Sequence, residues 1–295
     1  MKRVAFIGLG AMGLPMATNL LAKGFTVAGY DLSPKALEAF EGAGGQRAET
    51  AAEAAAEAEV LILMVVNAAQ AEAVLFADGT QDALPRGSIV VLMATCAPGS
   101  VEALAARVEA AGCRFVDAPV SGGVVGAASA TLTIMAAAAQ ETFEAVRPVL
   151  DAIGDKVFHV GERPGQGAVV KTVNQLLCGV HIAVVAEAFA LAEKVGVDLD
   201  ILLEIMSGSA ASSWMLKDRG PRMLESNPKV TSAVDIFVKD LGIVLEAGRD
   251  AKAALPLAAV AHQLFLAASG RGEGAADDSQ VIRTYHAMNG TDRTR

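Results

Sequence analysis

The 295-residue sequence predicts an α/β domain with a doubly wound parallel sheet, followed by an all-helical domain with a long interdomain helix. In the first half, short β-branched runs alternate with Ala-rich helical stretches, an order typical of a parallel sheet covered by helices on both faces. In the second half we find no clear strand. The length also fits two domains of about 100–200 residues each. We therefore expect domains at residues 1–161 and 162–295.

The expected strands are continuous apolar runs, which indicates burial on both faces of the sheet. Ser33 before Pro34 is a helix N-cap signal, and Pro34 and Pro98 both suit a first helical turn. The expected strands are Val4–Ile7, Thr26–Tyr30, Val60–Val66, Ile89–Met93, Arg114–Asp117, Thr131–Met135 and Lys156–His159. The expected helices are Met12–Lys23, Pro34–Phe40, Thr50–Ala58, Ala68–Phe76, Pro98–Ala111 and Glu141–Ile153.

The second half is expected to be helical. A helix over Gly167–Val195 is apolar nearly all round, so it must be buried in a large core or against another subunit. We therefore expect a homodimer or homotetramer. Gly220-Pro221 indicates a solvated turn between Arg219 and Arg222. Further helices are expected at Leu199–Ser207, Ala233–Arg249 and Leu257–Ser269.

Composition and charge argue against several classes of protein. The net charge is −9 and there is no basic tract, so no nucleic-acid partner is expected. No apolar run approaches the ~18–20 residues of a membrane span, and the N-terminus leads directly into the first strand, so neither a membrane partner nor a signal peptide is expected. The three cysteines and the four histidines lack the spacing of a disulfide framework or a metal site. We expect a cytoplasmic protein without a metal.

The most informative motif is Gly-x-Gly-x-x-Gly at residues 8–13, between the first strand and the first helix. In this context Gly8 makes the tight turn, Gly10 admits a pyrophosphate and Gly13 packs the helix on the strand, as in a Rossmann-type domain. Asp31 ends the second strand, 18 positions after Gly13, where a carboxylate binds the adenosine ribose. This carboxylate would repel a 2′-phosphate, so NAD is expected rather than NADP.

Two other segments carry polar groups that suit an anionic substrate. The stretch Asp117–Gly126 has consecutive glycines and Ser121, which can form an anion-binding nest, although an ordinary Gly-rich turn has the same composition. On the long helix, Lys171, Asn174 and Gln175 share one face. Burial would lower the pKa of the lysine toward a useful acid/base range, whereas a lysine at a helix start can also reach water.

Four segments together resemble the β-hydroxyacid dehydrogenase family, over essentially the whole chain. They are Gly8–Leu20, Asp117–Gly126, the Gly-x-Gly-x-x-x-Lys-x-x-Asn pattern at 165–174, and Lys239-Asp240. Within the family, 175–182 and 277–279 are similar to the branch that acts on L-threonate. The Asn174-Gln175 pair is similar to the tartronate semialdehyde reductase branch.

The resemblance implies a role for each matching residue. Lys171 would be the catalytic acid/base and Asn174 would orient the substrate. The substrate contacts implied are Ser121, Gly122, Gly123, Gln175 and Trp214, although Trp214 can equally be a packing residue. The NAD contacts implied are Gly8, Gly10, Ala11, Met12, Gly13, Asp31, Val66, Asn67, Thr95 and Lys239.

The expected function is NAD-dependent oxidation of a small β-hydroxy acid or sugar acid. L-threonate, 3-hydroxyisobutyrate and glycerate or tartronate semialdehyde are the substrate types considered. Two alternatives stay open at this point. One is a catalytically silent NAD-binding or scaffold protein, against which the presence of Lys171 counts. The other is a semialdehyde reductase that works in the opposite direction.

Overall fold

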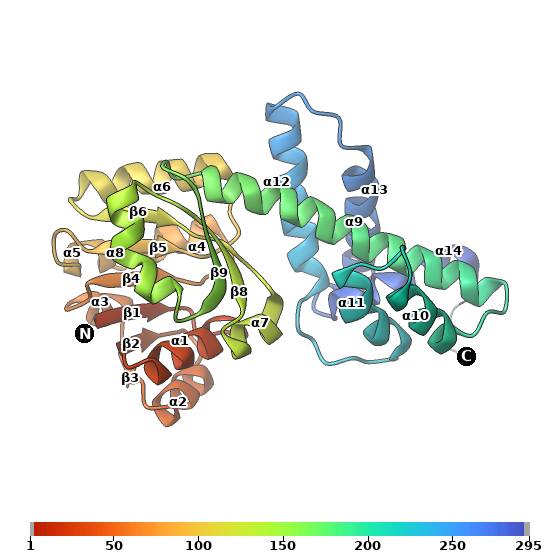
Figure 1. The fold of residues 1–295 in the computed structure, drawn as a ribbon, viewed down its shortest axis with the longest axis horizontal. Helices are drawn as coiled ribbons and strands as arrows, with labels where there is room; N and C mark the ends of the chain where they lie inside the picture. Colours follow the sequence, from red (N-terminus) through yellow and green to blue (C-terminus); the bar gives the residue numbers. More distant parts are fainter. Residues whose placement is uncertain (1–2, 292–295) are drawn as a thin grey trace. The chain divides into compact units, whose positions relative to one another are not determined.

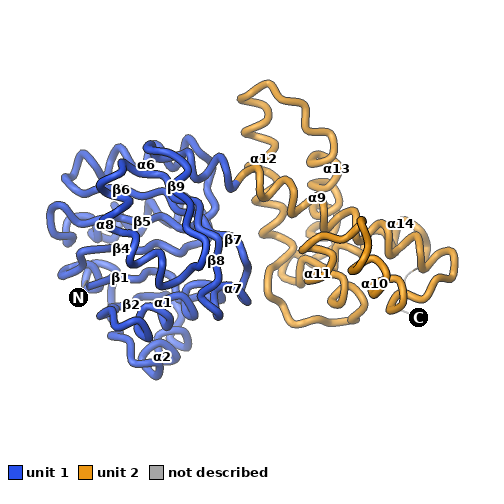
Figure 2. Tube along the Cα trace, viewed as in Figure 1, with its two compact units in different colours: residues 1–171 blue, residues 172–295 orange. Residues whose placement is uncertain are grey.

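The computed structural model describes residues 3–291. The chain divides into two compact units, residues 1–171 and 172–295 (Figure 2). Helix α9 (Gln166–Lys194) begins in unit 1 and continues into unit 2. The expected boundary after residue 161 precedes this helix and stays a prediction.

Unit 1 is a mostly parallel sheet with helices on its faces, as the sequence predicts (Figure 1). The strand order is β3-β2-β1-β4-β5-β6-β8-β7, with β9 beside β8; β8 runs antiparallel to β6 and β7. The strands are β1 Arg3–Ile7, β2 Thr26–Tyr30, β3 Gln46–Arg47, β4 Val60–Leu63, β5 Ile89–Leu92, β6 Arg114–Asp117, β7 Val120–Ser121, β8 Leu132–Ala137 and β9 Gly154–Gly161. The helices are α1 Gly13–Ala22, α2 Pro34–Gly42, α3 Ala51–Ala55, α4 Ala68–Glu72, α5 Thr80–Ala83, α6 Pro98–Ala110, α7 Gly123–Ser129 and α8 Gln140–Leu150, with a π-helical turn η1 at Ala73–Ala77.

Both faces of this sheet are buried because successive strand residues point to opposite sides. In β1, Val4 and Phe6 belong to one apolar core, whereas Ala5 and Ile7 belong to the other. The same alternation divides β4 between the two cores. This arrangement explains why the strands read as unbroken apolar runs.

Some element limits differ from those expected. β4 ends at Leu63, so Val66 lies in the following loop and not in the strand. The 50–58 helix is shortened to α3, whose Ala51, Ala54 and Ala55 are buried against the sheet. The elements that the sequence analysis missed in unit 1 are β3, β7, α5 and α7, none of which exceeds seven residues.

Unit 2 is helical and is built around one apolar core that includes Phe189, Phe237 and Phe265. Its described residues contain one isolated β-bridge, between Ala233 and Asp277. After α9 the helices are α10 Leu199–Gly208, α11 Trp214–Leu224, α12 Val234–Asp250, α13 Pro256–Ala268 and α14 Ile282–Asn289, with shorter turns η2 Ser269–Glu273 and η3 Asp278–Val281.

The solvated turn expected at Gly220-Pro221 is wrong. Both residues lie inside α11, and Arg219 beside them is 7% exposed. Arg219 forms a bidentate ion pair with Asp278, with nitrogen–oxygen distances of 2.9 and 2.8 Å. These partners, 59 positions away in sequence, satisfy a charge that could not otherwise be buried.

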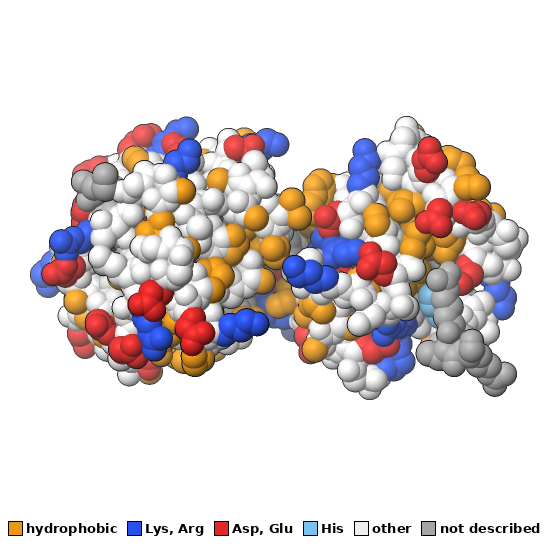
Figure 3. All heavy atoms as spheres, turned by 90° about the horizontal axis from the view of Figure 1, so that it is seen from below, with side chains coloured by type: hydrophobic (Ala, Val, Ile, Leu, Met, Phe, Trp, Pro, Cys, Tyr) orange, Lys and Arg blue, Asp and Glu red, His pale blue; other side chains and the backbone are white. Residues whose placement is uncertain are grey.

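Helix α9 is the longest helix of the described residues. By length and composition alone it could cross a membrane, but half of its apolar window is buried within the chain. Core helices of globular proteins can have the same length and composition. Hydrophobic side chains reach the surface of unit 2 in several places (Figure 3). Those contributed by the unit 2 part of α9 are Val173, Leu177, Val184 and Leu191.

Candidate active site

The glycine motif forms the turn between β1 and α1 at the carboxyl edge of the sheet. A Cβ on Gly8 would overlap the carbonyl oxygen of Met64, and one on Gly13 would overlap that of Gly8. At Gly10 a Cβ would meet no heavy atom within 4 Å. The backbone is therefore closely packed at the first and third glycines and open at the second, where a pyrophosphate must approach.

Asp31 follows β2 and is tied to the same turn. Its Oδ2 accepts the N–H of Leu9 at 2.6 Å, and its Oδ1 accepts the N–H of Ser33 at 2.8 Å. A carboxylate oxygen has a second lone pair, so these contacts leave acceptor capacity for ribose hydroxyls. The side chain is partly exposed, which is compatible with ligand contact.

The expected NAD contacts Val66, Asn67 and Thr95 follow β4 and β5. They lie on this edge of the sheet as well, because β1, β4, β5 and β6 are parallel neighbours. Asn67 caps α4 by accepting the N–H of Gln70 at 2.9 Å, while the Gln70 side chain accepts the N–H of Val66 at 2.9 Å. This reciprocal capping fixes the loop. Thr95 follows β5 and is partly buried.

Ser121 and Gly122 lie between the end of β6 and helix α7, and Gly123 is the first residue of that helix. Ser121 belongs to the short strand β7, whereas Gly122 and Gly123 have φ angles of 133° and 61°. These backbone conformations suit glycine. The loop is partly exposed at the same edge of unit 1 as the glycine motif.

Asp117 ends β6, and the sequence analysis did not assign it a role. It is 1% exposed. Its Oδ2 accepts the N–H groups of Gly165 at 3.0 Å and Ala168 at 2.8 Å, and the backbone of Gly167 contributes a further hydrogen bond. Burial raises the pKa of Asp117 to about 6, while these hydrogen bonds oppose the rise. The available signal was an ionisable residue directly after the buried Phe115 and Val116.

Lys171 lies one turn further along α9, three positions after Ala168, and is 7% exposed. A lysine this deeply buried is rare in proteins and requires polar partners. The Asp117 contacts fix the start of the helix that carries it.

In unit 2, Asn174, Gln175 and Lys239 are connected through Asp240, another residue without an assigned role in the sequence analysis. Asn174 Nδ2 donates to Gln175 Oε1 at 2.9 Å. Gln175 Nε2 donates to Asp240 Oδ2 at 2.5 Å, and Lys239 Nζ is 2.6 Å from Asp240 Oδ1. The Asp240 carboxylate is 2% exposed. It therefore determines which end of the Gln175 amide faces Asn174.

Close packing of α9 on α12 makes these contacts possible. A Cβ on Gly179 would be 2.8 Å from Leu241 Cδ2, so any larger residue here would require the Leu241 side chain to move. Gly179 lies one turn after Gln175, and Leu241 follows Asp240. Asn174 also donates to Cys178 Sγ at 3.4 Å.

Trp214 is not part of this hydrogen-bond network. It begins α11 after the N-cap Ser213 and is 53% exposed. The Arg219 guanidinium lies 5.9 Å from the centre of its ring. Arg219 is itself fixed by Asp278, so the first turns of α11 have a defined position.

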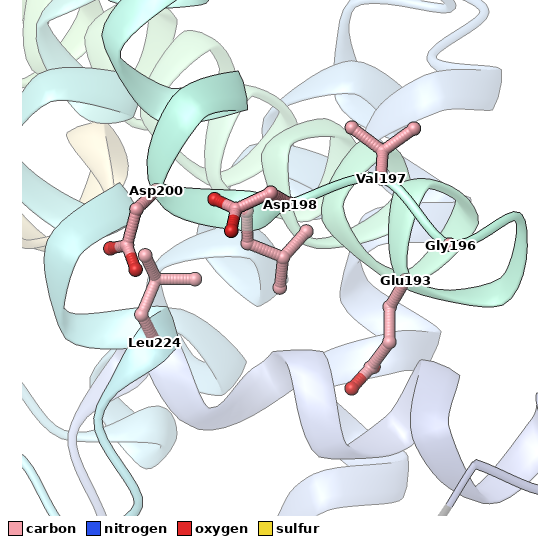
Figure 4. A pocket seen from close by; sticks show the side chains of 7 residues that line it. Glu193, Gly196, Val197, Asp198, Asp200 and Leu224 are labelled. Carbon is pink, nitrogen blue, oxygen red and sulfur yellow. The ribbon is translucent and has the colours of Figure 1, made fainter.

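A cavity of about 480 Å³ lies at the turn between α9 and α10, away from the residues described above (Figure 4). Its lining includes the carboxylates of Glu193, Asp198 and Asp200 and contains no lysine or arginine. Like charge makes it unsuitable for a hydroxy acid anion. Among residues 3–291 no group of three or more histidine, cysteine or acidic side chains suits a metal ion.

Comparison with known proteins gives a consistent result over both units. Residues 3–161 match the NAD-binding domain of 6-phosphogluconate dehydrogenase, and residues 165–285 match the NAD-binding region of NADP-dependent 3-hydroxyisobutyrate dehydrogenase. The chain is 46% identical to an L-threonate dehydrogenase of Cupriavidus necator, with 96% of each chain covered. It is 34% identical to an NAD-dependent L-serine dehydrogenase of Pseudomonas aeruginosa, covering 98% of this chain and all of that one.

A solved structure agrees with these matches. The structure of 3-hydroxyisobutyrate dehydrogenase from Salmonella typhimurium has a TM-score of 0.92 and 38% sequence identity to this chain. The alignment covers 96% of this chain and 99% of that one.

Proposed function

This chain belongs to the β-hydroxyacid dehydrogenase family and is an NAD-dependent hydroxyacid dehydrogenase; we propose that it oxidises L-threonate or a closely related sugar acid, with Lys171 as general acid/base. The observation that carries the catalytic part is the burial of Lys171 beside a carboxylate-anchored helix start in unit 1. The choice of substrate is supported by the identity with L-threonate dehydrogenase over nearly the whole chain.

The residues present fit NAD. The open space at Gly10, the packed backbone at Gly8 and Gly13, and the partly exposed Asp31 carboxylate suit a pyrophosphate and a ribose without a 2′-phosphate. Bound NAD supplies the hydride acceptor. We propose Ala11, Met12, Val66, Asn67, Thr95 and Lys239 as further cofactor contacts.

The proposed task of Lys171 is proton transfer. As general base, its neutral amine takes the proton from the substrate hydroxyl as that carbon is oxidised, and in the reverse direction its ammonium returns the proton. The buried environment keeps bulk water from competing for that proton. Asn174, one turn further along the helix, is proposed to orient the substrate, with Gln175 holding the Asn174 amide.

The substrate carboxylate is proposed to bind at Ser121, Gly122 and Gly123. The Ser121 hydroxyl and the backbone N–H groups of this loop are donors suited to an anion. The loop and Lys171 belong to the same unit. Asp117 connects them, because it precedes the loop in sequence and its side chain contacts the start of the helix that carries Lys171. We propose Trp214 as an additional substrate contact.

The proposal is tested by following NADH formation with L-threonate, D-glycerate, 3-hydroxyisobutyrate and L-serine. The expected result is a kcat/KM for L-threonate at least tenfold above the others. The reverse reaction with NADH and tartronate semialdehyde is measured in the same series. A higher kcat/KM for the semialdehyde would identify a reductase, and NADH binding without turnover of any compound would identify a silent NAD-binding protein.

A further inference from the structure

The strongest unexplained group in unit 1 is the buried carboxyl of Asp117. Three backbone N–H groups from the start of α9, those of Gly165, Gly167 and Ala168, converge on it. The first N–H groups of a helix have no partners within the helix, and the helix dipole favours a negative charge there. Here a strand 48 positions earlier in the chain supplies the cap.

We propose that Asp117 is a positioning residue that clamps the first turn of α9 to the end of β6 and thereby sets the position of Lys171 relative to the Ser121–Gly123 loop. This inference rests on the proposed function of Lys171. The contacts between Asp117 and the amides of Gly165, Gly167 and Ala168 are called the Asp117 clamp below.

The packing around Gly167 supports the clamp independently of the hydrogen bonds. A Cβ on Gly167 would lie 2.5 Å from the carbonyl oxygen of Met135, 2.8 Å from that of Asp117 and 3.0 Å from the Asp117 Cγ. The two distances to carbonyl oxygens are below the closest approach that real Cβ atoms make, so the helix start is seated directly on the end of β6 and on β8. Even one added methyl group would displace it.

The clamp connects two parts of the proposed site. Asp117 lies four positions before Ser121 along the chain, and Ala168 lies three positions before Lys171, on the same face of α9. A shift of the helix start is therefore passed directly to the lysine. Displacements of about 1 Å in a catalytic group can lower a rate by about 100-fold.

The clamp is expected to respond to pH. Burial raises the pKa of the Asp117 carboxyl to about 6, and protonation exchanges its charged hydrogen bonds for neutral ones. Titratable side chains on the neighbouring segments include Glu102 on α6 (which lies beside Gly165), Glu162 and Arg163 before α9, Lys171 on α9 and His159 on β9. β5 and β8 face Asp117 with the apolar Leu92 and Ala137.

The first experiment measures the clamp without relying on activity. Hydrogen exchange of the full chain is followed over residues 163–171 at pH 5 and pH 8, as protection factors that remove the intrinsic effect of pH. In the wild type, protection should differ between the two pH values, because the Asp117 carboxyl titrates between them. In Asp117→Asn, which has no titrating group at this position, protection should be equal at both pH values. Equal protection in wild type and variant at pH 8 would overturn the clamp.

The second experiment measures its consequence for catalysis. Asp117→Asn should lower kcat by about 10–100-fold with little change in the KM for NAD, since the glycine motif is untouched. Below pH 6 the wild-type enzyme should need Asp117 to lose its proton before it is active, whereas the variant has no such group. A plot of log kcat/KM against pH should therefore have a slope one unit greater for the wild type than for the variant. A uniformly lower rate with an unchanged profile would show a structural role only and would overturn the positioning role.

Two further variants make the result decisive. Gly167→Ala should lower kcat in the same direction as Asp117→Asn because it displaces the helix start while leaving the carboxyl in place. Asp155→Asn, an exposed carboxylate of the same unit, is the matched control and should behave as wild type in both experiments. If Lys171→Met were fully active, the proposed function would fail, while the exchange data would still decide whether the clamp exists.

Discussion

Gln175 and Asp240, 65 positions apart in sequence, are joined by a hydrogen bond of 2.5 Å in the interior of the helical unit. Asp240 accepts, so Gln175 must donate with Nε2 and present its Oε1 to Asn174. Both N–H bonds of the Asn174 amide then have acceptors, Gln175 Oε1 and Cys178 Sγ. The orientation of a proposed substrate-binding amide is thus determined by a carboxylate that the sequence did not single out.

Asp240→Asn is expected to lower kcat/KM by roughly 10–100-fold, the contribution of a hydrogen bond to a charged group. The introduced amide can donate toward Gln175 and thus reverse the orientation of both amides. Gln175→Glu alone should be worse, because it places two carboxylates in contact. The double variant should recover much of the activity, since the introduced glutamate accepts from both neighbouring amides. Steady-state kinetics on the four proteins test this, and no recovery in the double variant would contradict it.

Lys171→Met is expected to lower kcat by about 10²–10⁴-fold, the usual contribution of a positioned acid/base. The affinity for NAD, measured by fluorescence titration, should barely change because the glycine motif and Asp31 are unaltered. Lys171→Arg should not restore activity, since a guanidinium stays protonated at neutral pH. Near-wild-type turnover in the Met variant would mean that another group, with His181 the next candidate, accepts the proton.

Asp31→Ser is expected to narrow the preference for NAD over NADP by about 10–100-fold in kcat/KM, because the charge that opposes a 2′-phosphate is removed. Some loss of NAD affinity should accompany this, because the bond from Leu9 to the carboxylate is also lost. The comparison is made at equal ionic strength with both cofactors. A wild-type enzyme that used NADP as well as NAD would contradict the role of Asp31.

The protein is expected to form a dimer or a larger assembly. Val184 and Leu191 are 52% and 63% exposed on one stripe of α9, and an apolar stripe of this kind is characteristic of a contact surface. Light scattering at micromolar concentration should give a multiple of the 30.1 kDa chain mass. Leu191→Glu should lower that mass, and Leu32→Glu, an 89% exposed leucine of unit 1, should not. A wild-type particle of one chain would refute the expectation.

Asp117 is expected to make stability depend on pH with an unusual sign. Its folded-state pKa, about 6, is above the ordinary value of 3.8, so the folded state binds the proton more tightly than the unfolded state. The contribution of Asp117 to the free energy of unfolding therefore decreases as pH rises from about 4 to 6 and is constant above pH 6. The total decrease is about 3 kcal/mol. Asp117→Asn should be more stable than wild type at pH 8, by about 1–3 kcal/mol.

Urea unfolding of wild type, Asp117→Asn and the control Asp155→Asn at pH 4.5, 6 and 8 measures this difference. A variant that is less stable than wild type at pH 8 would show that the backbone hydrogen bonds outweigh the cost of burying the charge. If Asp117→Asn is more stable than the wild type and also has a lower kcat, then Asp117 contributes to activity at the expense of stability.

The sequence pattern determined most of the fold in advance, because buried strands form continuous apolar runs and long helices form periodic ones. The strands β2 and β6 and the body of α9 lie where the apolar runs predict them. The elements β3, β7, α5 and α7 were missed because the strands have two residues each and neither helix exceeds two turns. The turn expected at Gly220-Pro221 failed for another reason: local signals there were overridden by the ion pair between Arg219 and Asp278.

For the proposed site, the sequence by itself determined the fold family, the cofactor and the candidates Lys171 and Asn174, because glycine spacing and helix offsets are local properties of the chain. Only the tertiary structure revealed Asp117 and Asp240. Each is an ordinary carboxylate in sequence, and each acquires its role from partners 48 to 65 positions away. Burial then makes the difference, since a carboxylate removed from water must be satisfied by specific donors and so fixes the groups that satisfy it.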